Sequence, residues 1–229
     1  MSASELLPLV VIRPEPGNAA TCAAAREMGL QPVGAPLFEI EPVEWDVPAM
    51  HFDAILAGSA NVFRHGGPGL ARFADVPVIA VGETTAAEAR AAGFAIARIG
   101  GGGLQPIVAT LAPGNYIRIA GEDRVILDPP EGVRIETAVV YAALKRAFPA
   151  QLQGVLAQPA VVLLHSGEAA RHFARECERL GIRKENLHLA CLAPRIAELA
   201  GSGWGSVAVA AGRTDNEVLE LAHRMCQTV

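Results

Sequence analysis

The sequence lacks the features that mark several protein classes. Its four cysteines are scattered without C-x-x-C spacing, so neither a disulfide framework nor a cysteine metal site is indicated. No uninterrupted apolar run approaches the roughly 20 residues that a membrane-spanning helix needs. The N-terminus lacks the basic segment, apolar run and cleavage pattern of a secretory signal. We therefore expect a cytoplasmic protein with reduced thiols that does not cross a membrane.

Positive charge is also scarce. The 19 lysines and arginines stand against 24 aspartates and glutamates, which gives a net charge of −5. Nucleic acids and anionic membranes attract proteins that have a dominant basic surface. We expect neither as a partner, whereas binding of small anions by a few local arginines stays open.

Motifs for metal and triad chemistry are missing. The sequence contains no H-E-x-x-H, no G-x-S-x-G and no clustered Cys/His set, so we expect no metal site and no catalytic triad. The glycine run at 100–103 lacks the spacing of a phosphate-binding loop and is expected to be a flexible loop. His65 and His172 end two similar segments and could act as an acid–base pair, but histidines at helix ends are common without function.

Short aliphatic runs recur along the chain and indicate a parallel sheet. Most are continuous, as in strands buried on both faces. They lie at 9–12, 54–57, 78–81, 95–99, 116–120, 161–164, 187–192 and 207–211. Between them lie helix signals: Asn18 as a cap, Thr84 before an alanine-rich segment, Glu168 at the start of an amphipathic segment, and a capping box at 214–217. This alternation predicts an α/β fold.

The chain also resembles itself. Residues 53–65 and 160–172 each read as a strand, a serine-containing loop and a helix, with Ser59 matching Ser166. The C-terminal module is one strand–helix unit short, and residues 9–28 can supply it. We expect two lobes of parallel sheet flanked by helices: a discontinuous domain of 1–36 and 144–229, and an inserted domain of 37–143. Segments 37–43 and 137–143 would form a two-stranded β connection, with a cleft between the lobes.

Small polar residues or glycines follow most of the predicted strands. Parallel sheets bind ligands at the carboxyl ends of their strands, and the helix N-termini there attract anions. For any single loop, helix capping or a turn is the favoured explanation, because capping alone already selects serine, threonine and glycine. Five such loops together favour a binding site for an anionic ligand.

Several segments occur in an order that resembles a known family. They are V-I-R-P-E-P-G at 11–17, P-L-F-E-I-E-P at 36–42, G-S-A-N at 58–61, A-V-G-E-T-T-A at 80–86 and V-V-Y-A at 139–142. Together they resemble the uroporphyrinogen-III synthase family. The resemblance implies two α/β lobes and an enzyme that cyclises hydroxymethylbilane, a linear tetrapyrrole, with ring-D inversion and loss of water. It also implies a monomer that uses no metal or organic cofactor.

The resemblance and the strand-end loops together suggest site residues. Tyr141 would be catalytic, hydrogen bonding to the departing hydroxyl. Substrate contacts would come from Arg13, Ser59, Ala60, Asn61, Gly82, Thr84, Thr85, Ser166 and Arg195.

The sequence departs from the family pattern at several of these loops. The usual Thr-Ser-Ala-Asn begins with Gly58, the second-lobe loop reads His165-Ser166-Gly167, and the usual Arg-Gly-Glu appears as Ala120-Gly121-Glu122. Arg118, Arg124 or Arg195 would then take over anion contacts. The segment after Gly121 is compressed where a longer helix is usual. The alternative function is a non-catalytic, two-lobed small-molecule binding or sensing protein; a phosphosugar or nucleotide enzyme would need a phosphate loop that is missing.

Overall fold

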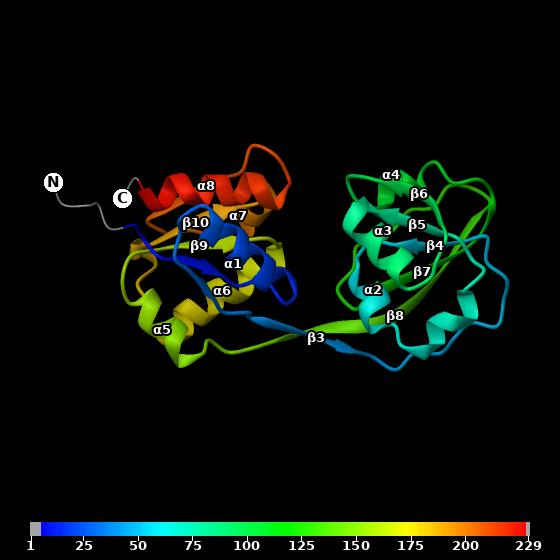
Figure 1. Ribbon diagram of the computed structural model, residues 1–229, viewed down its shortest axis with the longest axis horizontal. Helices are drawn as coiled ribbons and strands as arrows, with labels where there is room; N and C mark the ends of the chain where they lie inside the picture. The colour runs from blue at the N-terminus through cyan, green and yellow to red at the C-terminus, as the bar shows by residue number, and fades with distance from the viewer. Residues whose placement is uncertain (1–5, 228–229) are drawn as a thin grey trace. The chain divides into compact units, whose positions relative to one another are not determined.

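The computed structural model describes residues 6–227 (Figure 1). The chain divides into two compact units. The first, which we call unit 1, combines the chain up to Glu39 with the chain from Lys145 onward, and unit 2 comprises Ile40–Leu144. The chain therefore passes between the units twice.

Unit 1 is built on a parallel five-stranded sheet, sheet A, with the order β11-β10-β9-β1-β2. The strands are β1 (Leu9–Val11), β2 (Pro32–Gly34), β9 (Ala160–Leu164), β10 (Leu187–Cys191) and β11 (Ser206–Val209). Every residue of β1 and β9 is buried, which explains their continuous apolar sequences. β2, by contrast, is a short edge strand, and none of its residues is buried.

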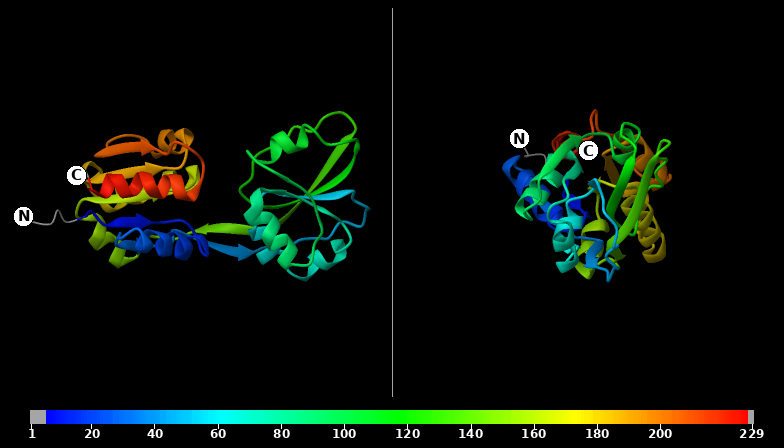
Figure 2. Two further views of the ribbon diagram at one scale, coloured as in Figure 1. Left: turned by 45° about the horizontal axis from the view of Figure 1, so that its top comes forward. Right: turned by 90° about the vertical axis from the view of Figure 1, so that its right-hand side faces the viewer.

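Helices cover both faces of sheet A (Figures 1 and 2). On one face, α1 (Gly17–Glu27) and α8 (Asp215–Gln227) pack their apolar side chains against β1 and β9. On the other face lie α5 (Ala150–Leu156) and α6 (Gly167–Leu180), and α7 (Pro194–Ala200) packs beside α6. Phe173 of α6 stacks between Phe148 and Trp204, with ring centroids 5.3 and 5.7 Å away. Sheet A is thus the middle layer of three.

Unit 2 contains most of sheet B, a mixed sheet with the order β3-β8-β7-β4-β5-β6. The strands are β3 (Phe38–Pro42), β4 (Ala54–Ala57), β5 (Val78–Val81), β6 (Ile96–Gly100), β7 (Gly114–Gly121) and β8 (Val133–Lys145). From β8 to β6 all pairs are parallel. One face is covered by α2 (Asn61–His65), the 3-10 helix η1 (Pro68–Phe73) and α3 (Gly82–Ala91), and the other by α4 (Leu104–Val108).

The connection from β7 to β8 is unusual for parallel neighbours. Such a connection normally contains a helix that covers one face of the sheet. Residues 122–132 contain no helix, and they lie on the α4 side, where Gln105 and Asp128 exchange two hydrogen bonds of 2.9 Å. A loop therefore occupies the place of a crossover helix on this face.

The parallel α/β prediction is confirmed, and the strands predicted at 54–57 and 78–81 have the observed bounds. The capping box is also confirmed: Thr214 N–H donates to Glu217 Oε2 at 3.2 Å, and Glu217 N–H donates to Thr214 Oγ1 at 3.3 Å. The prediction for Asn18 was wrong. Asn18 lies buried inside α1, and its side-chain amide donates to the carbonyl of Val11 at 2.7 Å, which ties the helix to the end of β1.

Two further helix predictions need correction. Thr84 does not precede α3 but lies in its first turn, because the helix begins at Gly82, whose φ is +77°. His172 does not end a helix: α6 continues to Leu180, and His172 Nε2 lies 2.7 Å from the carbonyl oxygen of Arg146. The match between His65 and His172 therefore does not extend to their structural surroundings.

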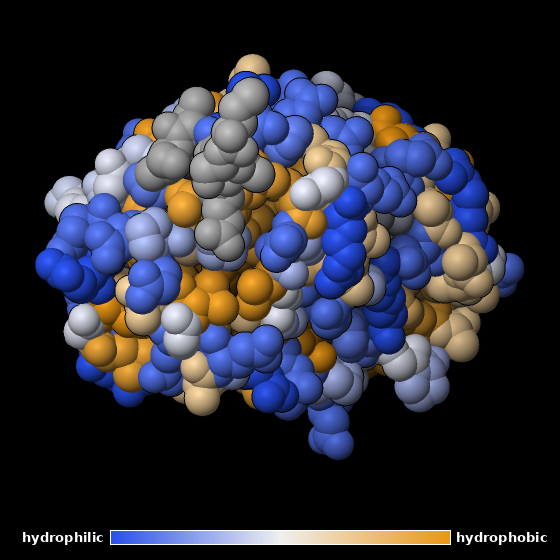
Figure 3. Space-filling view, turned by 60° about the vertical axis from the view of Figure 1, so that its left-hand side comes forward, coloured by the Kyte–Doolittle hydropathy of each residue, from blue (hydrophilic) through white to orange (hydrophobic). Residues whose placement is uncertain are grey.

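The face drawn in Figure 3 is predominantly polar. On the face in Figure 3, hydrophilic side chains alternate with smaller groups of hydrophobic ones. Within residues 6–227, no helix combines the length and the apolar character needed to cross a membrane.

Candidate functional site

A pocket of about 240 Å³ lies where several strands of sheet B end. Gly58 and Ser59 come directly after β4, Gly121 ends β7, and Tyr141 lies beside it on β8. This is the edge at which parallel sheets bind ligands. Two of the predicted site residues, Ser59 and Tyr141, thus line the same pocket.

Tyr141 is half-buried, and its ring packs directly over Gly121. A Cβ at position 121 would lie 2.5 and 2.6 Å from two carbons of this ring and 2.9 Å from its hydroxyl oxygen, closer than side chains tolerate. The centroid of the His65 ring lies 6.2 Å from that of Tyr141. The Tyr141 hydroxyl makes no hydrogen bond to any described residue, so it is available to a ligand.

The other predicted contacts of unit 2 lie around the starts of α2 and α3. Asn61 N–H donates to Ser59 Oγ at 3.2 Å, and Ala60 is buried. Thr84 is exposed on α3, whereas Thr85 is only 4% exposed and faces the core. Neither Ala60, Asn61 nor the Gly82–Thr85 segment lines the pocket that contains Tyr141.

Two arginines line this pocket as well. Arg118, on β7, is only 6% exposed, and Arg124 lies in the loop that follows. Burial, and then the charge of Arg124, lower the pKa of the Arg118 guanidinium. The two cations therefore lie close enough to affect each other at the end of the strand that carries Arg118.

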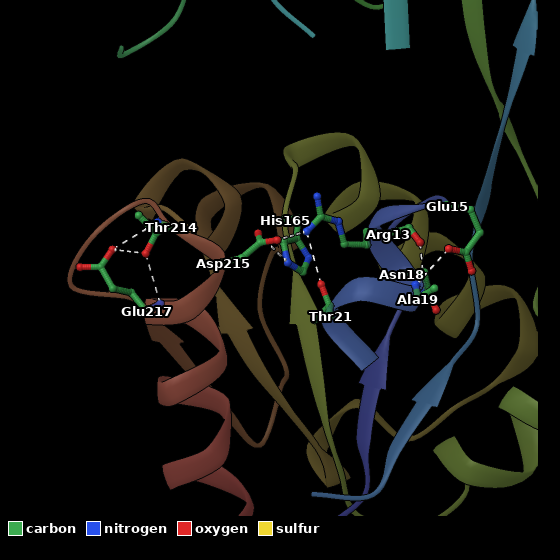
Figure 4. A network of polar contacts seen from close by, with 9 residues as sticks. All are labelled: Arg13, Glu15, Asn18, Ala19, Thr21, His165, Thr214, Asp215 and Glu217. Carbon is green, nitrogen blue, oxygen red and sulfur yellow. Dashed lines mark hydrogen bonds and ion pairs between the residues drawn. The ribbon is translucent and has the colours of Figure 1, made fainter. Parts of the chain in front are cut away.

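In unit 1, the ends of β1 and β9 and the start of α8 bring three charged or titratable side chains together (Figure 4). Arg13 forms an ion pair with Asp215 and also lies 3.4 Å from Thr21 Oγ1. His165, which follows β9, lies between them, with Nε2 at 3.5 Å from Asp215 Oδ1. This cluster sits at the carboxyl edge of sheet A.

His165 is the most constrained member of this cluster. Its side chain is only 9% exposed, and neither ring nitrogen has a hydrogen-bond partner among residues 6–227. Burial, and then the Arg13 charge, lower the pKa of His165 to about 4, although Asp215 acts in the opposite direction. The imidazole is therefore neutral near pH 7.

The remaining predicted residues of unit 1 differ in role. Ser166 is the N-cap of α6, and its Oγ accepts from Ala169 N–H at 3.1 Å. Arg195 is exposed in the first turn of α7 and forms no ion pair within the described part of the chain. Arg13 and Ser166 share the edge of sheet A at which His165 and Asp215 lie.

Sequence reasoning noted His165 only as a departure from the family pattern and did not propose His165 or Asp215 as a site residue. Both had a signal, because His165 directly follows a buried strand and Asp215 lies inside the recognised capping box. They are 50 positions apart, however, and only the fold brings them together. Within residues 6–227, no group of three or more His, Cys, Asp or Glu side chains could hold a metal ion.

Comparisons with known proteins agree on one family. The model of the family described as uroporphyrinogen-III synthase HemD matches residues 19–220. The crystal structure of a uroporphyrinogen-III synthetase from Helicobacter pylori 26695 is similar, with a TM-score of 0.64 and 16% identity, and the match covers 96% of this chain and 100% of the other. The crystal structure of a mutant uroporphyrinogen III synthase from the extremely thermophilic bacterium Thermus thermophilus is also similar, with a TM-score of 0.57 and 16% identity. That match covers 97% of this chain and 100% of the other.

These structural likenesses, at such low identity, establish a shared fold. A search of curated protein sequences found no match. The family model, in contrast, spans most of the sequence, including all of sheet B and every strand of sheet A except β1. The chain therefore belongs to the uroporphyrinogen-III synthase family and is an enzyme of that kind.

Proposed function

We propose that this enzyme converts hydroxymethylbilane into uroporphyrinogen III, with inversion of ring D and loss of water. The observation that carries this proposal is the family match over residues 19–220. The fold supports it, because both sheets present helix starts and small polar loops at their carboxyl edges.

The reaction requires few acid–base groups from the protein. A pyrrole nitrogen of the substrate can expel the hydroxyl group to form an azafulvene, and the substituted carbon of ring D then attacks through a spiro intermediate. The main task of the enzyme is to hold the linear tetrapyrrole so that this attack precedes direct ring closure without inversion of ring D. Tyr141 donates a hydrogen bond to the departing hydroxyl, a role that its unpaired phenol supports.

The substrate carries eight carboxylates. The protein has a net charge of −5, so its overall charge does not attract them. Backbone N–H groups at the strand-end loops hold them, helped by the side chains of Ser59, Thr84 and Ser166. Thr85, predicted as a further contact, is buried at the start of α3 and does not offer its side chain to the substrate. Ala60, Asn61 and Gly82 contribute through their backbone positions in the same loops. Arg13 and Arg195 add charge, and Arg13 would exchange its ion pair with Asp215 for one with the substrate.

We also propose that the protein acts as a cytoplasmic monomer without a metal or organic cofactor. Nucleic acid and membrane are not partners in this proposal. Burial raises the pKa of Cys177 to about 12 and those of Cys191 and Cys226 to about 11, so these thiols stay protonated and unreactive.

One experiment tests the function directly. Hydroxymethylbilane is generated enzymatically in the presence of the protein, and the porphyrin isomers are separated after oxidation. We expect mainly the type III isomer, against mainly type I in samples without protein or with heat-denatured protein. Type I product at every protein concentration would contradict the proposal and leave a non-catalytic binding protein.

A further inference from the structure

Arg118 is a buried cation without an anionic partner. Its Nη1 donates to the carbonyl of Val125 at 2.7 Å, but its Nε is fully buried and makes no hydrogen bond to any residue from 6 to 227. No acidic side chain in that range lies within ion-pair distance of its guanidinium. Burying an unpaired charge is costly, so this arrangement calls for an explanation.

Arg118 lies next to two pockets. It lines the pocket of about 240 Å³ that contains Ser59 and Tyr141, and also a second pocket of about 470 Å³. Arg118, Arg124 and Val125 are common to both pockets. The loop 122–132 runs here in place of a crossover helix, so the guanidinium remains next to open space.

Arg124 is held with its charge unpaired as well. Its Nη1 donates to the backbone carbonyl of Glu122 at 2.7 Å, which fixes the side chain without neutralising it. Asp123 lines the smaller pocket and Glu122 the larger one, but both residues are exposed and neither forms an ion pair with Arg118 or Arg124. Two guanidinium groups therefore converge where no carboxylate of the described chain neutralises them.

We propose that Arg118 and Arg124 form a carboxylate-binding site that receives one of the acidic side chains of the tetrapyrrole. The inference rests on the proposed function and adds to it a charged contact that orients the ligand against Tyr141. A carboxylate suits the site because its two oxygens can accept N–H donors from the guanidinium groups of Arg118 and Arg124, neither of which has an acidic partner in the described part of the chain. The substrate thus supplies the missing counter-charge.

The test measures binding, apart from turnover. Titration calorimetry with the product, uroporphyrinogen III, under anaerobic conditions compares the wild type with Arg118→Gln, Arg118→Lys and Arg124→Gln. Arg134→Gln is the matched control, because Arg134 is an exposed arginine on β8 that lines neither pocket. The urea midpoint of each variant is measured on the same samples.

We expect Arg118→Gln to raise the Kd at least roughly tenfold and Arg124→Gln roughly three- to tenfold, because charge-assisted hydrogen bonds are lost. Arg118→Lys should recover part of the affinity. Arg134→Gln should change the Kd less than about twofold, since exposed charges act weakly. The urea midpoint of Arg124→Gln should stay at the wild-type value.

Unchanged affinity in both Arg118→Gln and Arg124→Gln would overturn the proposal. An equal loss in Arg134→Gln would also overturn it, since the effect would then be one of net charge. If the wild type yields only the type I isomer but the two arginine variants bind uroporphyrinogen III more weakly than it does, the proposed function fails while the carboxylate site stands. If the wild type yields type III and the arginine variants bind normally, the site fails alone.

Discussion

The two tyrosines of the chain differ in what their hydroxyl groups contact. Tyr116 donates to the carbonyl of Ala112 at 3.0 Å, whereas Tyr141 opens into the pocket with a free hydroxyl. We predict that Tyr141→Phe lowers kcat at least roughly tenfold, because the departing hydroxyl loses a proton donor. Steady-state kinetics measure this effect.

Tyr116→Phe is the matched control for that prediction. It removes a phenol from the same sheet and a backbone hydrogen bond, so it should cost about 1 kcal/mol of stability while leaving kcat unchanged. An unchanged kcat in Tyr141→Phe would remove the catalytic role from Tyr141.

His165 predicts a pH dependence of stability. Its pKa is lowered from 6.5 to about 4 in the folded protein by burial and by Arg13, with Asp215 opposing them. The unfolded chain therefore binds one more proton between pH 6.5 and pH 4, and stability falls as the pH decreases through this window. The loss attributable to His165 is about 3 kcal/mol in total. Urea unfolding at pH 4, 5.5 and 7 measures it.

The control for this prediction is a variant in which a side chain that does not titrate replaces His165. His165→Asn should unfold with a smaller change of free energy between pH 7 and pH 4 than the wild type, because all other titrating groups are retained. If both proteins lose the same free energy over this range, the buried imidazole is not the cause.

Among the secondary-structure elements, the contact between β7 and β8 determines the position of the Tyr141 ring. Because the Tyr141 ring occupies the space beside Gly121, Gly121→Ala should push it out of place and lower kcat at least roughly tenfold, as in Tyr141→Phe. Gly101→Ala is the control, since a Cβ there meets no atom within 4 Å. Kinetics of both variants, with circular dichroism to confirm folding, decide the point; normal turnover in Gly121→Ala would show that the ring position is unimportant.

The same elements show how far sequence reasoning reaches. β4 and β5 could be predicted to the residue because they are continuous aliphatic runs of fully or mostly buried strands. β2 was missed because it has three residues, two of which are proline and glycine, and it lies at a sheet edge. Residues 133–136 of β8 were missed because Arg134 and Glu136 interrupt the apolar pattern.

The candidate site was less predictable than the strands. Ser59 and Tyr141 were found from loops and from family resemblance, and the structure brings them into one pocket. The unpaired state of Arg118 is invisible in sequence, because it depends on which acidic residues the fold keeps away from β7. The roles of Thr84 and Arg195 stay predictions.

For the molecule as a whole, the two connections between the units lead us to predict a conformational change when ligand binds. The units are linked covalently only at Glu39–Ile40 and at Leu144–Lys145. Such links permit rigid-body motion, and positioning chemistry benefits from enclosing the substrate. We expect saturating uroporphyrinogen III to decrease the radius of gyration measured by small-angle X-ray scattering, whereas citrate, a smaller polycarboxylate, should not. Superimposable profiles with and without the product would argue against closure.

The position of β1 inside sheet A has a consequence for how the protein is made. β1 pairs with β2 on one side, but on the other it pairs with β9, whose residues follow the whole of unit 2 in the sequence. During synthesis on the ribosome, the apolar segment Leu9–Ile12 can pair with β2 early, but its β9 neighbour is made only after about 150 further residues, which include the whole of unit 2. The inserted unit is then the first to mature, and the nascent N-terminus is the part that most needs protection from aggregation.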